Sequence, residues 1–343
     1  MHSVIFKNDA VGDLVHSLGA ITNIISSSKR VTIFLSNRSK NFSFLIQNQK
    51  VKIKILNYNL TLVEKIKLIF FFIKNKINTA YILSPKSFYY FLPLIFKKTK
   101  FYGICIDNVN NYKRPNKYLR NFLYKYEIND RSMNFRRPST RTLQNRLTSS
   151  SDKKTEYNIN IFPEKSDILK KYLPKNYIYF HFKKKIFDEL NWSFNDFYSI
   201  LNEFIKYSNY VVVTKDIEID NNNKLFRENF SFYDFKKGEY NNKNRKILFF
   251  DNIEGINLFD TIKHSQKVVA FHGMMTNLGF LLKKPVLDLY HCKINSWSDY
   301  RRYRNSFYEF KPKYKDYDFI IPKKDIKKTL MKMKFSLDKC KTN

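Results

Sequence analysis

Residues Val4–Ala20 read VIFKNDAVGDLVHSLGA, and this stretch passes from one predicted element of structure to the next. The short apolar run Val4–Phe6 is typical of a buried strand, whereas apolar residues recur at helical spacing from Asp13 onward. Gly12 stands at the junction, where a glycine lets a ligand approach the backbone closely. A carboxylate such as Asp13 is stabilised at the start of a helix by the helix dipole. The pattern predicts the strand–loop–helix unit of an open α/β sheet.

The position of Asp13 indicates a functional role, because open α/β sheets bind ligands beyond the carboxyl ends of their strands. Two interpretations stay open: Asp13 acts in catalysis, or it caps the first helix. His16 lies one helical turn further on and shares the same face as Asp13. The GxGxxG spacing is absent, so this is not a dinucleotide-binding fingerprint.

Outward from this segment, strand-like runs alternate with helical patterns over most of the chain. Further strands are predicted at Val31–Leu35, Val51–Leu56, Ala80–Leu83, Phe101–Ile106, Tyr177–Phe182, Tyr210–Thr214, Lys246–Phe250, Lys267–Phe271 and Val286–Leu289. Helices are predicted at Asp13–Ile25, Leu62–Lys74, Phe194–Tyr207, Leu258–Ser265 and Met275–Leu282. Such alternation favours parallel sheets covered by helices on both faces. A polar gap divides the pattern, which predicts two such sheets.

We therefore expect two Rossmann-like, doubly wound domains, residues 1–165 and 166–322, facing one cleft, with a basic helix and tail at 323–343. The tail helix can pack back on the first domain. The gap at 130–160 is rich in Ser, Thr and Asn and holds five of the chain's 14 arginines, Arg131, Arg136, Arg137, Arg141 and Arg146. It is either a solvated interdomain linker or a loop that faces phosphate or lipid, since guanidinium binds phosphate with two hydrogen bonds.

A second segment with the residues of a ligand site is Ala270–Gly279, AFHGMMTNLG, where a strand again leads into a helix. A turn at Gly273 directs the amides of Met274, Met275 and Thr276 toward a ligand, and helix-start amides bind diphosphate well. His272, Thr276 and Asn277 can add side-chain donors. The alternative is a helix cap beside two core methionines.

A run of lysines that includes Lys183 and Lys185 follows the strand Tyr177–Phe182. Either lysine can serve as a diphosphate-binding cation of the second domain, or the run is solvated charge. The sequence has no HExxH motif, no paired Cys/His set and no DxD at a strand end. We therefore expect no metal and no cofactor.

The composition bears on partners. The formal net charge is +33, carried by 49 Lys against 14 Arg, and lysine, Asn, Ile, Phe and Tyr are all frequent together. This favours compositional drift over a dedicated nucleic-acid surface, so we expect an anionic membrane surface as a partner rather than nucleic acid.

Three scattered cysteines fit a reducing cytoplasm. We expect neither a signal peptide nor a transmembrane helix. The mainly apolar segment Leu60–Ile73 is expected to be an amphipathic helix, buried on one face or lying on a membrane.

The first segment also carries a family resemblance. Val11–Ala20, VGDLVHSLGA, resembles the LGD-x-x-H-[TS]-L-P-A loop of the family 9 glycosyltransferases, with Gly19 where proline is usual. The best-known members of that family are the bacterial lipopolysaccharide heptosyltransferases, which have the two-domain GT-B fold. In the family this aspartate is the proposed general base, so the resemblance implies that role for Asp13.

Two segments of the second domain are similar to family motifs with departures. Leu190–Phe197, LNWSFNDF, resembles K-x-W-P-x-x-x-[FW], but Leu190 replaces the lysine that contacts the donor diphosphate. Phe271–Leu278, FHGMMTNL, resembles the donor turn D-[TS]-G-x-x-H-x-A without its aspartate and histidine. The His-Gly-x-x-Thr-Asn order is also similar to donor turns of other GT-B transferases.

The resemblance implies an inverting transferase that moves a sugar from a nucleotide-activated donor to a lipopolysaccharide, another cell-surface glycan or a lipid-linked acceptor. It implies a cytoplasmic enzyme, peripheral on the inner face of the membrane. Two alternatives stay open: a Rossmann-like nucleic-acid-binding protein, and an inactive relative of the transferases. Retention of Gly12 and Asp13 argues against the inactive relative.

Overall fold

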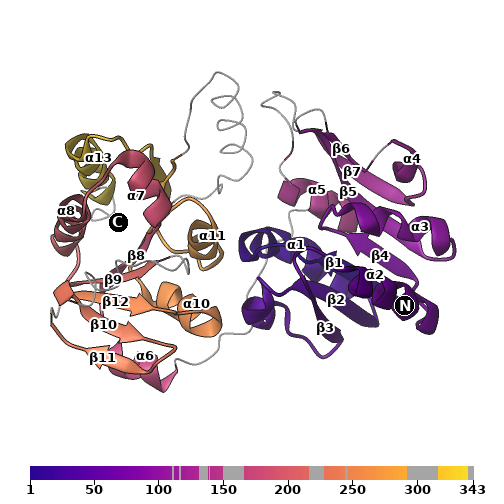
Figure 1. Ribbon diagram of the computed structural model, residues 1–343, viewed down its shortest axis with the longest axis horizontal. Helices are drawn as coiled ribbons and strands as arrows, with labels where there is room; N and C mark the ends of the chain where they lie inside the picture. The colour runs from indigo at the N-terminus through magenta and orange to yellow at the C-terminus, as the bar shows by residue number, and fades with distance from the viewer. Residues whose placement is uncertain are drawn as a thin grey trace. The chain divides into compact units, whose positions relative to one another are not determined.

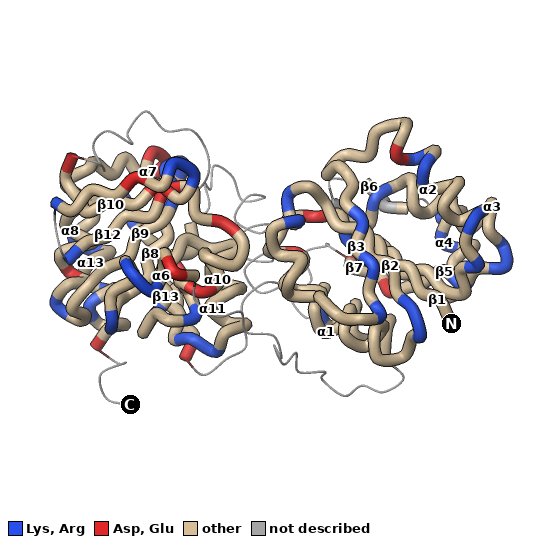
Figure 2. The backbone as a smooth tube through the Cα atoms, turned by 90° about the horizontal axis from the view of Figure 1, so that it is seen from below, with Lys and Arg blue, Asp and Glu red and all other residues tan. Residues whose placement is uncertain are grey.

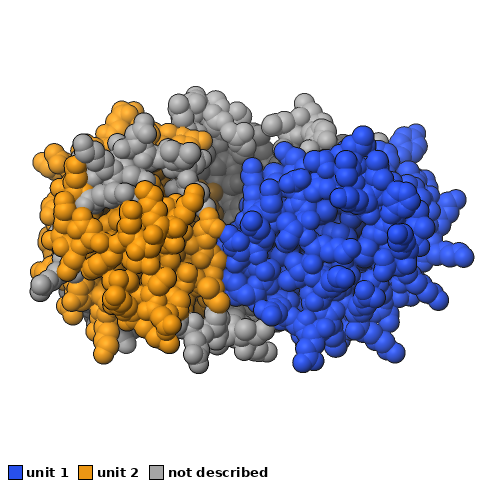
Figure 3. All heavy atoms as spheres, turned by 60° about the horizontal axis from the view of Figure 1, so that its bottom comes forward, with its two compact units in different colours: residues 1–162, 296–311 blue, residues 163–295, 312–343 orange. Residues whose placement is uncertain are grey.

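The computed structural model describes residues 1–109, 112–115, 117–130, 138, 140–149, 166–215, 228–243, 246–291 and 316–338. The chain divides into two compact units, residues 1–162 with 296–311, and residues 163–295 with 312–343 (Figure 3). The predicted boundary after residue 165 lies outside the described residues. Each unit is an α/β fold of its own, as the alternation of strand and helix patterns predicts.

The first unit is a parallel sheet with helices packed on it (Figure 1). Its strands are β1 His2–Lys7, β2 Arg30–Ser36, β3 Val51–Leu56, β4 Thr79–Ile82, β5 Lys100–Val109, β6 Tyr112–Arg114 and β7 Lys125–Asp130. Its helices are α1 Val11–Ser27, α2 Leu62–Lys74, α3 Leu92–Ile95, α4 Lys117–Arg120 and α5 Thr140–Thr148, with 3₁₀ turns at Lys40–Ile46 and Ser87–Tyr90. The strand order is β3-β2-β1-β4-β5, and β5 pairs with both β7 and β6. Among the described pairings in this sheet, β5 with β6 is antiparallel and the others are parallel.

Local sequence explains the elements that shape this unit. Every residue of β1 is buried, as expected for a central strand covered on both faces. A capping box starts α2: the Thr61 hydroxyl accepts from the Glu64 amide, and the Glu64 carboxylate accepts from the Thr61 amide. The Cys105 side chain, on β5, is fully buried, and this burial raises the pKa of its thiol to about 12.

The interpretation of the gap as a solvated linker is wrong for residues 140–148, which form α5. Leu143, Gln144 and Leu147 are buried there, and the helix packs against α1 and β7. The apolar pair at i and i+4 gives α5 one buried stripe, although the other residues are polar. Arg141 and Arg146 belong to this helix, whereas Arg131, Arg136 and Arg137 lie outside the described residues.

The second unit contains a larger sheet. Its strands are β8 Tyr177–Phe182, β9 Tyr210–Lys215, β10 Ser231–Asp234, β11 Glu239–Asn241, β12 Ile247–Asp251, β13 Lys267–Phe271, β14 Val286–Leu289 and β15 Tyr317–Ile320. Its helices are α6 Asp167–Tyr172, α7 Lys184–Leu190, α8 Phe194–Ile205, α10 Gly255–His264, α11 Met274–Leu281 and α13 Ile326–Asp338. The strand order is β11-β10-β12-β9-β8-β13-β14-β15. Among the described pairings, only the short β11 runs antiparallel to its neighbour.

The helix near the C-terminus is present as α13, but its predicted packing on the first domain is wrong. α13 packs against α8 and β15 of the second unit. Met333 and Leu337 are buried in the apolar core of that unit. The indole Nε1 of Trp192 ties the segment before α13 to the same core by donating to the carbonyl oxygens of Lys323 and Lys324, at 3.0 and 3.1 Å.

The two strand orders fix where each unit can bind a ligand. In the first sheet β1 has β2 on one side and β4 on the other, so the chain reverses its winding at β1 and β4. In the second sheet the same reversal lies between β8 and β13. Ligands of doubly wound sheets bind beyond the carboxyl ends of the strands at such points. The segments that follow β1 and β13 are the two that the sequence singles out.

Candidate functional site

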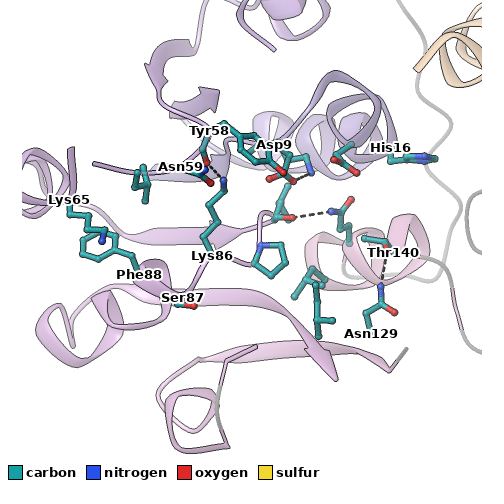
Figure 4. Close-up of a pocket in the computed structure, with 18 residues that line it drawn as sticks. Asp9, His16, Tyr58, Asn59, Lys65, Lys86, Ser87, Phe88, Asn129 and Thr140 are labelled. Carbon is teal, nitrogen blue, oxygen red and sulfur yellow. Dashed lines mark hydrogen bonds and ion pairs between the residues drawn. The ribbon is translucent and has the colours of Figure 1, made fainter. Parts of the chain in front are cut away.

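A cavity of about 610 Å³ opens at the reversal point of the first unit (Figure 4). Its walls come from the ends of β1, β4, β5 and β7, the starts of α1 and α5, and the loop between β3 and α2. The lining residues are Lys7, Asp9, Asp13, His16, Tyr58, Asn59, Leu60, Lys65, Leu83, Pro85, Lys86, Ser87, Phe88, Ile104, Ile106, Asn129, Thr140 and Gln144. The predicted pair Asp13 and His16 therefore lies at a cavity large enough for a small polar ligand.

The start of α1 explains how Asp13 reaches the cavity. The helix begins at Val11, and its N-cap is Ala10, which makes no side-chain cap hydrogen bond. Asp13 stands in the first turn with an exposed side chain, so the interpretation of Asp13 as the cap residue is wrong. Gly12 is the second residue of the helix and is half-buried. The backbone freedom expected of Gly12 is therefore not used, since this position is helical.

His16 is held by an arginine that the sequence places in a linker. The Arg141 guanidinium, on α5, lies 3.1 Å from His16 Nδ1, on α1. Guanidinium only donates hydrogen bonds, so Nδ1 accepts and the ring proton resides on Nε2. Burial lowers the pKa of Arg141 because it removes water from the cation. The packing of α5 on α1 thus sets both the tautomer and the orientation of His16.

Lysines that belong to no motif of the sequence line much of the remaining wall. Lys7 pairs with Asp9 at 2.7 Å, and the Lys7 side chain is almost fully buried. Lys86 donates to the carbonyl oxygen of Tyr58, and its Nζ lies 4.0 Å from the centre of the Tyr58 ring. Lys65 approaches the cavity from α2 beside Phe88 (Figure 4). Lys7 is the last residue of β1 and Lys86 lies in the loop after β4. A place at the carboxyl end of a buried strand is the signal that also identifies Asp13.

The far wall depends on β7 and α5, two elements that the sequence does not predict. Asn129 Nδ2, at the end of β7, donates to Thr140 Oγ1 at 2.8 Å. Gln144 Nε2, on α5, donates to the carbonyl oxygen of Leu83 at 3.3 Å. These hydrogen bonds hold α5 against the ends of β4 and β7, so Thr140 and Gln144 of this helix form one wall of the cavity.

The second unit brings Lys183 and the Gly273 turn together at its own reversal point. Lys183 follows β8, Gly273 follows β13, and these strands are neighbours in the sheet. Lys183 Nζ donates to the carbonyl oxygen of His272 at 2.9 Å. The same Nζ would lie 2.9 Å from a Cβ atom at position 273. Gly273 therefore makes room for the lysine, and its φ of +150° is a backbone conformation that side chains rarely adopt.

Gly273 is the N-cap of α11, and the Asn277 amide donates to its carbonyl oxygen at 3.2 Å. The amides of Met274, Met275 and Thr276 precede this first helical bond, as expected for the amides that bind an anion at a helix start. The side chains of Met275, Thr276 and Asn277 are buried. The predicted side-chain donors Thr276 and Asn277 are therefore enclosed in the core, and the prediction of a diphosphate site at this turn rests on the backbone amides.

His272 is anchored by a carboxylate that no sequence motif marks. Its Nδ1 lies 2.6 Å from Asp288 Oδ2, and Asp288, on β14, is fully buried. Asp288 also accepts from the Tyr317 hydroxyl at 2.7 Å and from Thr276 Oγ1 at 3.4 Å. Burial next to this carboxylate raises the pKa of the Tyr317 phenol well above its usual range. The sequence feature that could have identified Asp288 is an acidic residue within the short apolar strand Val286–Leu289.

The segment Leu190–Phe197 contributes packing rather than a ligand contact. Leu190, Trp192 and Phe197 are all buried in the apolar core of the second unit. Leu190 therefore packs in the core at the position where the family motif has a diphosphate-binding lysine. The lysine that does lie beside the Gly273 turn is Lys183. Lys185, the other predicted candidate, is exposed on α7.

No three His, Cys, Asp or Glu side chains among the described residues are grouped as a metal site. No helix within the described ranges is long and apolar enough to cross a membrane.

Comparison with known proteins identifies the fold. No family model and no curated protein matches the sequence. Solved structures do match along nearly the whole chain. The ADP-heptose lipopolysaccharide heptosyltransferase II of E. coli is 12% identical with a TM-score of 0.64, covering 99% of this chain and 100% of its own. A family 9 glycosyltransferase from Veillonella parvula is 10% identical with a TM-score of 0.65, covering 97% and 89%.

A nucleotide-sugar epimerase shares the architecture to a lesser degree. The UDP-GlcNAc 2-epimerase of Methanocaldococcus jannaschii is 13% identical with a TM-score of 0.54, covering 97% of this chain and 91% of its own. At such identities the likeness defines fold and not substrate. The chain has the GT-B fold of the family 9 heptosyltransferases, as the motif around Asp13 predicts.

Proposed function

We propose that this protein is an inverting glycosyltransferase that moves a sugar from a nucleotide-activated donor to a lipopolysaccharide or another cell-surface glycan. The observation that carries the proposal is the position of Asp13. It lies at the cavity of the first unit, in a chain whose fold is that of sugar transferases acting on nucleotide donors. The acceptor is assigned to this cavity, and the donor to the Lys183–Gly273 turn of the second unit.

In this mechanism Asp13 acts as the general base. Its carboxylate takes the proton of an acceptor hydroxyl while the hydroxyl oxygen attacks the anomeric carbon of the donor sugar. The bond from that carbon to the diphosphate breaks, and the nucleoside diphosphate leaves with the electron pair. Attack from the face opposite the leaving group inverts the configuration at the anomeric carbon.

The second unit would stabilise the leaving group. Negative charge grows on the diphosphate as the bond breaks, and fixed dipoles and cations near that charge lower the barrier. The amides of Met274, Met275 and Thr276 would supply the dipoles, and Lys183 the cation. Asp288 would hold the His272 ring beside the leaving group through Nδ1. The nucleotide sugar is a substrate here, and no separate cofactor is proposed.

The acceptor cavity carries cations beyond the Lys7–Asp9 ion pair. Lys65 and Lys86 line it together with Asp13, and Arg141 stands behind His16. A phosphate or carboxylate on the acceptor would interact favourably with these cations. We further propose that the enzyme works as a peripheral protein at the cytoplasmic face of the bacterial membrane, where the lysine excess of the chain meets anionic lipid. Described lysines and arginines occur on elements of both units (Figure 2).

A thermal-shift panel of nucleotides and nucleotide sugars tests the proposal, because a ligand that binds the native state raises the apparent stability. A sugar nucleotide should raise the melting temperature of the wild-type protein, and the free nucleoside diphosphate should raise it in the same series. Transfer is then measured with the best donor and an extracted glycan acceptor. Donor binding without transfer to any acceptor would favour the inactive relative, and conversion of the donor without an acceptor would favour an epimerase.

A further inference from the structure

The helix α2 carries apolar side chains on two separate faces. Leu68 and Phe72 are only 2% and 4% exposed and pack into the core of the first unit. Five other apolar side chains of the same helix are open to solvent: Leu62 at 71%, Val63 at 58%, Ile66 at 45%, Phe70 at 55% and Ile73 at 64%. A surface helix of a globular protein ordinarily has one apolar face and one polar face. The outer face of α2 departs from that rule.

The five exposed residues form one stripe, which we call the α2 stripe. At about 100° per residue, positions 62, 63, 66, 70 and 73 all fall within an arc of roughly 100°. Leu68 and Phe72 project from the other side of the helix, so core packing does not account for the stripe. A contiguous apolar surface on a described, well-packed unit marks a place where something else binds.

Charges around the stripe indicate the chemistry of its partner. Lys67 and Lys74 follow one edge of the stripe on the helical wheel, and Lys65 lies beyond Ile69 on the other side. Lys67 and Lys74 are exposed, as is Lys76 just beyond the helix. Apolar residues bordered by lysines fit a lipid surface with anionic headgroups, because the apolar face enters the acyl boundary while the ammonium groups meet phosphate. A second copy of the chain fits less well, since it brings its own +33 charge.

The stripe also lies next to the cavity assigned to the acceptor. Lys65 lines that cavity from α2, and Tyr58, Asn59 and Leu60 line it from the loop that leads into the helix. A membrane that received the outer face of α2 would therefore stand at the rim of the cavity. A sugar acceptor anchored in lipid would reach the cavity without leaving the bilayer.

We propose that the α2 stripe is the surface by which this protein docks on an anionic membrane. The inference deepens the peripheral attachment proposed above and rests on it, but it does not depend on the sugar-transfer reaction. The helix would lie in the plane of the interface, with Leu62, Ile66, Phe70 and Ile73 inserted among the acyl chains. The lysines at its borders would contact the headgroups.

The test is co-sedimentation of the full-length protein with vesicles of phosphatidylcholine alone, or mixed with phosphatidylglycerol, across a salt series. The stripe variant carries Ile66→Ser, Phe70→Ser and Ile73→Ser. Its matched control carries Met331→Ser and Phe335→Ser, because these side chains on α13 are 68% and 67% exposed. Melting temperature, nucleotide binding and sedimentation velocity are recorded for each protein.

We expect wild type and control to bind the anionic vesicles and to dissociate as salt rises. The stripe variant should bind at least tenfold more weakly while its melting temperature and nucleotide binding stay unchanged. Equal binding of the stripe variant would overturn the assignment to α2 but leave peripheral attachment standing. Failure of wild type to bind any vesicle would overturn both. A dimer of wild type that the stripe variant loses would make a second copy the occupant, against the proposal.

Discussion

The imidazole of His272 is held by the fully buried carboxylate of Asp288, with 2.6 Å between Nδ1 and Oδ2. The carboxylate comes from β14, the strand next to the one that His272 follows. Because the carboxylate only accepts, Nδ1 carries a proton, and Nε2 is the nitrogen that a ligand can meet. The ring of Tyr290 packs edge-on against the imidazole, with 4.4 Å between the two ring centroids, and limits its movement. Asp288 is therefore a positioning residue in the proposed donor site.

We expect Asp288→Asn to weaken nucleotide-diphosphate binding by about tenfold and to destabilise the fold by about 1–3 kcal/mol, since the buried network loses its charge and one of its two acceptor oxygens. Isothermal titration and chemical unfolding measure the two effects. Tyr317→Phe removes another hydrogen bond to Asp288 without touching His272, so it should cost stability and spare affinity. Equal affinity losses in both variants would argue that Asp288 acts only through the fold.

Lys183→Met should lower the affinity for a nucleoside diphosphate by about tenfold, because a charge-assisted contact with phosphate is lost. Methionine keeps the length of the apolar stem, which limits the structural effect. Lys185→Met is the matched control, since Lys185 is exposed on the neighbouring helix. Titration with the diphosphate and with the corresponding nucleoside separates the phosphate contact from base binding. A loss that is equal for diphosphate and nucleoside would contradict the assignment.

Asp13→Asn should reduce sugar transfer by roughly a hundredfold or more, because asparagine cannot act as a useful general base. Stability should change by less than about 1 kcal/mol, the usual contribution of a carboxylate to the helix dipole. Nucleotide affinity should stay unchanged, since the proposed diphosphate site belongs to the other unit. His16→Ala is measured beside it for turnover, melting temperature and nucleotide binding. Near wild-type turnover of Asp13→Asn would make the proposed mechanism wrong.

Leu147→Ala should destabilise the protein by about 2–4 kcal/mol, the usual cost of emptying a buried leucine site. Leu147 is 3% exposed on α5, a helix that closes the cavity. Arg146→Ala is the neighbouring surface control and should stay within about 0.5 kcal/mol. Urea unfolding of both variants makes the comparison. Equal and small effects would show that α5 contributes little to the fold.

Alkylation of Cys105 should be very slow at pH 8 in the native protein. Thiolate is the reactive form, and a pKa raised to about 12 leaves almost all of this thiol protonated there. The labelling rate should rise with pH and jump on unfolding, when burial no longer raises the pKa. Mass spectrometry of the Cys105 peptide follows the reaction with iodoacetamide. Rapid labelling under native conditions would contradict burial of β5.

The sequence predicts most of the fold because the spacing of apolar residues and the length of apolar runs are local signals. All ten predicted strands are present, with ends that differ by a few residues, and α2 runs over the predicted residues Leu62–Lys74. Lys183 and Gly273 could be linked for the same reason: each follows a strand, and those strands proved to be neighbours.

Residues that depend on tertiary contacts could not be predicted in this way. α5 has a single stripe of two leucines within a polar segment, too weak a pattern to separate a helix from a loop. Asp288 is one acid in a short strand, and its partners come from β15, α11 and the end of β13. For α2, periodicity predicts the helix but not which of its two apolar faces is buried, because that depends on the sheet beneath it.

The contact between position 273 and Lys183 ties together two sites that lie far apart in the chain. A side chain at 273 would displace the ammonium group from the carbonyl oxygen of His272, and the φ of +150° there would strain it whatever residue stands at 183. The dependence between the two positions should therefore run one way over evolution. In relatives of this protein, lysine at 183 should accompany glycine at 273, whereas glycine at 273 should persist even where the lysine is lost.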